Sequence, residues 1–456
     1  MPNPLLLPEL REMLDTGDAD SLQAVSAELH PATVADFSEG LSVEDTWKLL
    51  DYAPVERQAE IFSFFPFDKQ IEMVDGVGRG RMSKLIEAMS PDDRVDLLKR
   101  LDTAVAESLI PLVTKAERQD IRTLLSFPEG SAGSVMTTEY ATLPADVAVG
   151  DAVTLLRQQA PSRETIYSIY VVDEVRHLMG FVSLRDLILA KPTMRIADLM
   201  HRDVISVRAD QDQEEAARML AKYDFLAIPV VNDQNQLIGI ITHDDVIDVM
   251  IEEATEDAQK MGGVVPMVED YLEAPFVTVW RKRAAWLSCL FVAELFTFSA
   301  LAYFEDEIKI VLALSLFVPL CISTGGNSGS QAATLITRAM ALGQISVGGW
   351  WRVLRHELVV GIALGLTLGA IGFVRASMTP ATVLGNADRW MLALVIAQSV
   401  AAICLWGTLV GSMLPLVFKR LGFDPGYASS PFVATFVDVT GIVIYFSIAK
   451  AFLLGP

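Results

Sequence analysis

Cysteine and histidine are scarce in this sequence of 456 residues, which contains three of the first and five of the second. Cys289, Cys321 and Cys404 lie in apolar runs without paired spacing, which predicts buried thiols rather than disulfides or a thiolate metal cluster. The histidines are scattered, and no Ser/His/Asp or Cys/His constellation or Walker loop occurs. We therefore expect a protein that is not an enzyme.

Two further features are missing. The formal net charge of −22 argues against the basic face that a nucleic-acid-binding protein presents. The amino-terminal residues MPNPLLLPELREML lack the basic region and the continuous apolar core of a signal peptide. We therefore expect the soluble part of the chain to stay in the cytoplasm.

The charge is distributed unevenly along the chain. Of the 36 Lys and Arg and the 58 Asp and Glu, only 9 and 8 follow residue 283, so the first part carries about −23 and the last part about +1. The last part is also strongly apolar. This division predicts an acidic soluble body joined to a membrane domain.

Five apolar runs are long enough to cross a bilayer, which takes about 20 residues. They are roughly 284–304, 309–340, 355–377, 390–418 and 430–454. The second run is too long for one straight helix, and we expect the glycine-rich stretch 325–329 to break it. Basic residues at 280–283 and 419–420 mark one side of the membrane. The positive-inside rule then predicts a multi-pass protein of the cell membrane with residue 283 in the cytoplasm and the carboxyl terminus outside.

Ionisable residues inside the spans are costly and indicate function by default. Asp438 stands out in the last span, where the alternative is a structural carboxylate that only accepts hydrogen bonds. Glu294 and Glu357 lie in the first and third spans, and their roles stay open.

The segment 319–339 is unusually polar for its depth in the membrane. Its glycines alone would fit close helix packing, but Asn327 and Gln331 together favour the lining of a pore. Carboxylate, amide and hydroxyl oxygens suit hard cations, and two Asp438 side chains at a two-fold axis would balance a divalent ion. Because one carboxylate per chain is too few ligands to strip Mg²⁺, we expect a largely hydrated ion.

The soluble part begins with a repeat of twelve residues over 30–125, with apolar pairs at a fixed place in most units. A short helix that cannot bury its face alone predicts a stacked α-helical superhelix. The expected helix starts are His30, Ser42, Pro54, Pro66, Gly78, Ser90, Asp102 and Thr114.

A longer duplication follows over 131–250, in which each copy is expected to form helix, strand, turn, strand and helix. Its recurring motif is Gly180, Ser183, Asp186 in one copy and Gly239, Thr242, Asp245 in the other, and the pair resembles tandem α/β CBS domains. That resemblance implies a regulatory module with an adenine-nucleotide site as one alternative.

An acidic helix follows the second copy. Asp245, Asp248, Glu252 and Glu256 share one face at helical spacing, where like charges repel. A solvated face is the plain interpretation. The position between a sensor-like pair and the first span favours carboxylates that divalent cations bridge.

The strings TGGNSGSQAATLITRA and PFVATFVDVTG, together with the order of the parts, resemble the MgtE family of magnesium channels over nearly the whole chain. The resemblance implies a homodimer that conducts Mg²⁺ and closes when cytoplasmic Mg²⁺ binds between its soluble parts. It also implies five domains: a helical superhelix (1–130), CBS domains (131–193 and 194–250), a connecting or plug helix (251–280) and a five-helix transmembrane domain (281–456).

The resemblance also implies site residues, matched one by one to this sequence. The pore set is Asp438, Ala434, Asn327, Gly325, Gly326, Gln331 and Thr334. The regulatory Mg²⁺ set is Glu60, Asp92, Asp96, Glu214, Asp224, Asp245, Asp248, Glu253, Glu256, Asp257 and Asp424. The nucleotide set is Tyr170, Arg185, Asp186 and Phe225. One departure is Ser430, which stands where the family commonly has Asn before the proline of the last span.

A second hypothesis is a cation-coupled secondary transporter of divalent metals that an adenine nucleotide regulates at the CBS pair. Selectivity among Mg²⁺, Mn²⁺ and Co²⁺ does not follow from the sequence.

Overall fold

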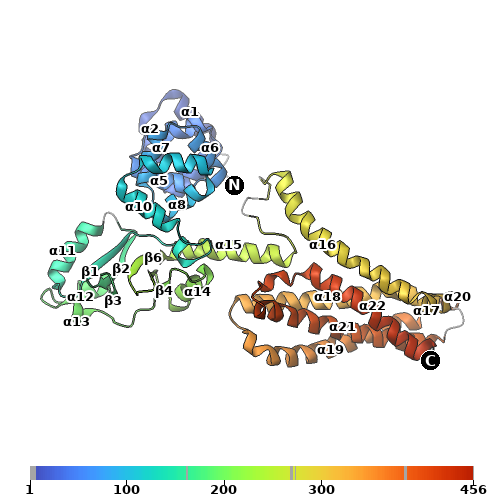
Figure 1. Cartoon of the computed structure of the whole chain (residues 1–456). Coiled ribbons are helices and arrows are strands. Elements are labelled where there is room, and N and C mark those ends of the chain that lie inside the picture. The colour runs from blue at the N-terminus through green and yellow to red at the C-terminus, as the bar shows by residue number, and fades with distance from the viewer. Residues whose placement is uncertain (1–6, 161–162, 268–270, 273, 385–387, 455–456) are drawn as a thin grey trace. The chain divides into compact units, whose positions relative to one another are not determined.

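The computed structural model describes residues 7–160, 163–267, 271–272, 274–384 and 388–454. It divides into two compact units, residues 1–251 and 252–456 (Figure 1).

The first unit opens with a stack of short helices, blue to cyan in Figure 1. All eight expected starts directly precede a helix, so the twelve-residue repeat is confirmed. The apolar pairs form its core, and Leu49, Ile61 and Phe62 are completely buried. The helices are α1 (Leu7–Thr16), α2 (Ala19–Gln23), α3 (Pro31–Ser38), α4 (Val43–Leu50), α5 (Val55–Ser63), α6 (Phe67–Asp75), α7 (Arg79–Ala88), α8 (Pro91–Arg100), α9 (Thr103–Leu109) and α10 (Lys115–Leu124).

Two three-stranded sheets of the same topology follow, one in each CBS module. The middle strand pairs in parallel with the first and antiparallel with the third, in the orders β1-β2-β3 and β4-β5-β6. The first strand of each sheet, which the expected pattern did not include, is thus an addition. The elements are β1 (Tyr140–Pro144), α11 (Val149–Gln159), β2 (Thr165–Val172), β3 (Leu178–Ser183), α12 (Leu184–Leu189), α13 (Ile196–Leu199), β4 (Val207–Arg208), α14 (Gln213–Tyr223), β5 (Ala227–Val231) and β6 (Leu237–Thr242).

The helix that closes the second module is also the connecting helix. It is continuous as α15 from His243 to Met261, so no separate helix begins at residue 251. Gly262 and Gly263 end it, and Gly263 adopts a positive φ of 71° that favours glycine. One element therefore joins the Thr242 motif to the second unit.

Among its described residues, the second unit contains five helices that are long and apolar enough to span a membrane, which confirms the five-helix expectation. α21 packs against α18, α19 and α22, and α18 also packs on α22, while α16 packs mainly on α22. Its helices are α16 (Phe276–Tyr303), α17 (Glu305–Ile310), α18 (Leu312–Ala341), α19 (Trp350–Ser377), α20 (Ala381–Leu384), α21 (Arg389–Arg420) and α22 (Ser430–Ala449).

The expected break at residues 325–329 is wrong, because α18 runs through this stretch without interruption. The chain instead bends at Val311, between α17 and α18. The glycines serve a close helix crossing. A methyl group on Gly407 of α21 would lie 2.2 Å from the carbonyl oxygen of Gly325. Only residues without a side chain permit this approach.

The first span is packed least. α16 leaves most of its surface exposed in the single chain, and Cys289 is exposed on it, contrary to the expectation of a buried thiol. Cys321 and Cys404 are buried as expected. An apolar cavity of about 250 Å³ lies between α16 and α22, lined by residues such as Leu290, Phe296 and Phe432.

Candidate functional site

Asp438 lies at the contact between α22 and α18. It is half-buried, and a methyl group on Gly326 would lie 3.4 Å from its Oδ1 atom and 3.5 Å from the Cβ atom of Ala434. The buried Gly325 faces Ile403 of α21 and Val437 of α22 instead. Gly326 thus lets the backbone of α18 approach the carboxylate directly.

A polar stripe continues from this point along α18. Ser323, Asn327 and Gln331 follow one another at four-residue spacing, and the side chains of Asn327, Gln331 and Thr334 are exposed in the single chain. We name Ser323, Asn327, Gln331 and Thr334 the polar stripe. Amide and hydroxyl groups at membrane depth normally face protein or water rather than lipid. We therefore expect this stripe to contact another protein surface or to face water.

Ser430 extends the stripe onto α22. Its hydroxyl lies 3.4 Å from the Thr334 hydroxyl, and its carbonyl accepts a hydrogen bond of 3.1 Å from Ser330. Ser430 thus offers an oxygen beside α18.

The two other carboxylates of the spans differ in their surroundings. Glu294 lies on the packed face of α16, accepts a hydrogen bond of 3.2 Å from Thr297, and is close enough to Asp438 to interact with it electrostatically. Glu357 lies half-buried on α19 beside His356.

The first unit brings acids of the superhelix and the second CBS module together. Asp92, in the first turn of α8, faces Asp245 in the first turn of α15, and its Oδ1 atom is buried without a hydrogen-bond partner. Burial, followed by the charges of Asp245 and Asp93, raises the pKa of Asp92 well above its usual range. Burial likewise raises the pKa of Asp245 to about 6, although Thr242 donates two hydrogen bonds to it. This pair therefore needs a proton or a metal cation.

More acids surround that pair. Burial is the main cause that raises the pKa of Asp96 and of Asp248, and Lys99 opposes it at Asp96 through an ion pair of 3.5 Å. Glu164, which sequence reasoning missed, has its pKa raised to about 7 by burial and by the charges of Asp92 and Asp244, although part of its side chain stays exposed. No local spacing connects Glu164 to Asp92, so only the fold reveals it.

Three expected regulatory acids have other local partners or roles. Glu60 pairs with Arg57 at 2.8 Å, Glu214 pairs with Arg218, and Asp224 ends α14 in the left-handed conformation with φ 53°. In the described part of the chain, no three His, Cys, Asp or Glu side chains meet closely enough to hold one metal ion. The hard oxygen donors fit Mg²⁺, which keeps several of its own waters in protein sites.

The remaining regulatory acids belong to the second unit. Glu256 on α15 and Asp424, which precedes the turn Pro425–Tyr427, both pair with Lys260. Glu253 and Asp257 lie on the same helix. Lys260, which the sequence did not single out, is thus the cation that joins two expected Mg²⁺ ligands.

The nucleotide candidates lie in both CBS modules. Tyr170 is 2% exposed in a cluster shared by the two modules, and its hydroxyl has no hydrogen-bond partner. Asp186 accepts a hydrogen bond of 2.6 Å from Ser183 and lies 3.5 Å from the His201 imidazole. Arg185 is exposed on α12, and the Phe225 ring stacks on Tyr223 at the end of α14. The described geometry therefore provides a free hydroxyl and an accessible carboxylate, but in separate clusters.

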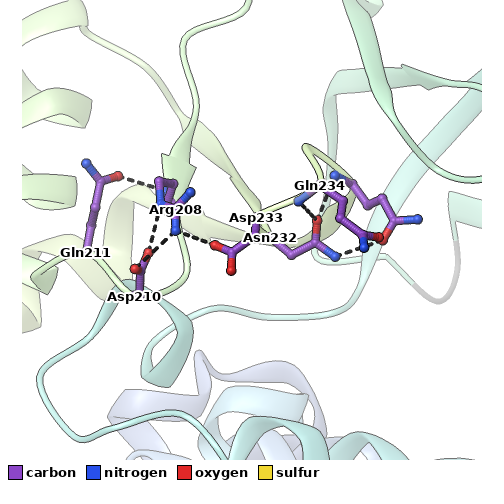
Figure 2. Close-up of polar contacts among 7 residues, drawn as sticks. Arg208, Asp210, Gln211, Asn232, Asp233 and Gln234 are labelled. Carbon is purple, nitrogen blue, oxygen red and sulfur yellow. Dashed lines mark hydrogen bonds and ion pairs between the residues drawn. The ribbon is translucent and has the colours of Figure 1, made fainter.

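A second polar cluster, drawn in Figure 2, lies in the second module. Arg208 of β4 pairs with Asp210 at 3.0 Å and with Asp233 in the turn between β5 and β6. Asn232 accepts the backbone N–H of Gln234 and so tightens that turn. A neighbouring cavity of about 430 Å³ is lined by both carboxylates. Because Arg208 pairs with both carboxylates and so connects β4 to the turn, this cluster is a structural tie.

Comparisons with known proteins place these features among transporters. The family described as divalent cation transporter (MgtE) matches residues 318–448, the MgtE intracellular N domain matches 29–130, and the CBS domain matches 132–192 and 196–252. The magnesium transporter MgtE of Thermus thermophilus is 39% identical over 449 residues, covering 97% of this chain and 98% of the relative. The magnesium transporter MgtE of Bacillus subtilis is 33% identical over 441 residues, covering 97% and 96%.

Two solved structures resemble the soluble unit. The cytosolic domain of the Mg²⁺ channel MgtE in complex with ATP is 38% identical, covers 54% of this chain and 100% of that chain, and has a TM-score of 0.51. The soluble part of a magnesium transporter is 34% identical, covers 54% and 98%, and has a TM-score of 0.52.

Proposed function

Because this chain belongs to the MgtE family of magnesium transporters, we propose that it is a Mg²⁺-selective channel for magnesium uptake that cytoplasmic Mg²⁺ closes. The observation that carries the proposal is Asp438, a carboxylate at membrane depth that contacts the backbone side of α18 beside the polar stripe. In this proposal Mg²⁺ is both the transported ion and the regulator.

The pore chemistry follows from the donor set. Asp438 supplies the negative charge, while Asn327, Gln331 and Thr334 supply neutral oxygens that hydrogen-bond to the waters of a hydrated ion. Gly326 and Ala434 place no bulky side chain beside Asp438, while Gly325, buried at the crossing with α21, supports the wall from behind. Two chains at a two-fold axis would place two Asp438 carboxylates across one path. We therefore propose a homodimer whose pore lies between the two copies.

The gating follows from the acids of the soluble part. At neutral pH the carboxylates of Asp92 and Asp245 repel each other, so their contact stays closed only when a cation or a proton balances them. Ions that bind one arrangement better shift the population towards it. Mg²⁺ at Asp92, Asp96, Asp245 and Asp248 would favour the closed arrangement, with the soluble unit in the cytoplasm and the carboxyl terminus outside.

The pore assignment is tested by replacing Asp438 in the full chain. Asp438→Asn keeps the size of the side chain and removes its charge, so we expect Mg²⁺ flux into liposomes driven by a Mg²⁺ gradient alone to fall at least about tenfold. Glu305→Gln at the exposed start of α17 is the matched control and should conduct normally. Normal flux through a folded Asp438→Asn protein would refute the pore assignment.

A second candidate function is a cation-coupled transporter whose rate an adenine nucleotide sets. The ATP complex of a cytosolic domain that is 38% identical to this chain favours it. In that case the wild-type protein would carry Mg²⁺ only with a proton or sodium gradient, and ATP would change the rate. Mg²⁺ flux in the absence of a proton gradient, a sodium gradient and ATP would exclude this candidate.

A further inference from the structure

The carboxyl-terminal turn of α15 carries a lysine held between two acids. The Lys260 ammonium donates to Glu256, one turn earlier on the same helix, and to Asp424 in the loop before α22. The Lys260 side chain is 12% exposed, and the two carboxylates are 35% and 32% exposed. A cation that is this well covered, with two charged partners, differs from an ordinary surface ion pair.

The backbone around this lysine fixes its position. Asp424 accepts the backbone N–H of Gly426 at 2.7 Å, which orients its carboxylate towards Lys260. A methyl group on Gly426 would lie 3.0 Å from the Cβ atom of Lys260, so the lysine stem packs directly on this turn. On the other side, Gln259 accepts the N–H of Met267 at 2.6 Å. The lysine is therefore built into the joint between α15 and the loop that begins the last span.

The charge at this joint is incomplete. The Lys260 ammonium pairs with both carboxylates, and these are its two recorded ion-pair partners. One positive charge faces two negative charges, which leaves the group with a net charge of −1. A divalent cation would balance both carboxylates, and their oxygens are the hard ligands that Mg²⁺ prefers.

We propose that Lys260 is a built-in competitor for Mg²⁺, an internal cation that occupies the place between Glu256 and Asp424 and must be displaced before Mg²⁺ binds there. This inference rests on the proposed function and deepens it, because it names the group that sets the Mg²⁺ concentration at which the channel closes. The ammonium in this place is itself the observation that the two carboxylates hold a cation. Lys260 is a positioning residue in the low-Mg²⁺ state and a competitor during closure.

The competitor and a simple structural tie predict opposite effects of removing the charge. If Lys260 competes, Lys260→Met frees both carboxylates and strengthens Mg²⁺ binding. If Lys260 only ties α15 to the loop, the same change weakens the joint, and closure needs more Mg²⁺. The direction of the shift therefore distinguishes the two roles.

The experiment uses the full-length protein in giant liposomes, with current recorded against Mg²⁺ on the face that carries the soluble unit. We expect Lys260→Met to close at a Mg²⁺ concentration roughly tenfold lower than the wild type. Lys260→Arg keeps a permanent charge and both partners and should close near the wild-type concentration. Lys309→Met is the matched control, because Lys309 also pairs with two acids, Glu305 and Asp306, but its side chain is 62% exposed.

A second measurement does not depend on conduction. Hydrogen exchange of the backbone N–H groups of Gly426 and Tyr427, in the turn Pro425–Tyr427, should become protected by Mg²⁺ at a lower midpoint in Lys260→Met than in the wild type. An unchanged or higher midpoint would overturn the proposal. If the exchange midpoint is lower in Lys260→Met but Mg²⁺ does not close the channel, the proposal that Lys260 competes with Mg²⁺ stands. The proposed gating by Mg²⁺ is then refuted.

Discussion

At the scale of single residues, Asp92 and Asp245 make the soluble unit sensitive to pH as well as to cations. Their pKa values in the folded protein lie above the usual value of 3.8, with that of Asp245 at about 6. The folded unit therefore binds more protons than the separated parts, and the contact is most stable at low pH. That stability is lost as the pH rises through about 6, and above this pH a divalent cation is needed in place of the proton.

We expect Asp245→Asn to remove this dependence. Because the amide carries no charge, the variant at pH 8 without Mg²⁺ should be about 1–2 kcal/mol more stable at the α8–α15 contact than the wild type. Hydrogen exchange of α8 in the full chain measures the change, and added Mg²⁺ should then protect it less than in the wild type. Asp68→Asn, an exposed acid on α6, is the control. A variant with less protection than the wild type would contradict the repulsion.

Residue patterns revealed some of these acids and not others. Asp245 was expected because a recurring motif and a helical face both contain it. Glu164 and Lys260 were missed for physical reasons. Glu164 meets Asp92 only through tertiary packing, and Lys260 follows Glu256 by four residues, which reads as an ordinary helical ion pair until the fold brings Asp424 to it.

At the scale of elements, the crossing of α18 and α21 depends on facing glycines. Gly407→Ala places a methyl group 2.2 Å from the Gly325 carbonyl oxygen, a backbone atom that cannot move aside cheaply. We expect a loss of stability of about 1–3 kcal/mol or more, together with reduced Mg²⁺ flux because α18 carries the polar stripe. Thermal unfolding of the purified protein in detergent measures the first effect.

The matched control is Gly349→Ala at the start of α19, where an added methyl group meets nothing within 4 Å. It should leave both unfolding and flux unchanged. Equal stability of Gly407→Ala and Gly349→Ala would contradict the prediction, because α18 and α21 would then accommodate a methyl group at their crossing without cost.

Periodicity predicted the helices of the soluble part but misjudged the glycines of the second span. Each twelve-residue unit has one capping position and one apolar pair, and both signals are local. The stretch 325–329 contains the signal of a break, because glycine weakens an isolated helix. Whether this stretch stays helical depends on α21, which supplies Gly407 and Gly411 at the crossing. No local sequence pattern shows that partner.

At the scale of the whole molecule, the polar stripe predicts how two copies meet. In a protein whose only cysteine is introduced by Asn327→Cys, with Cys289→Ser, Cys321→Ala and Cys404→Ala, a short bis-maleimide should join two chains in the membrane. Leu366→Cys on α19, also exposed in the single chain, is the control and should remain uncrosslinked. Equal crosslinking of both proteins, or none at Asn327→Cys, would contradict a pore between two copies.

The light packing of the first span has a mechanical consequence. α18 and α21 interlock through glycines, whereas α16 leaves a cavity of about 250 Å³ against α22. The membrane unit therefore deforms most easily at the contact between α16 and α22, where side chains such as Phe296 and Phe432 have room to move. A force on the start of α16 would displace this contact first and leave α18 in place. The α16–α22 contact near Asp438 would thus change, while the α18–α21 packing that shapes the ion pathway stays intact.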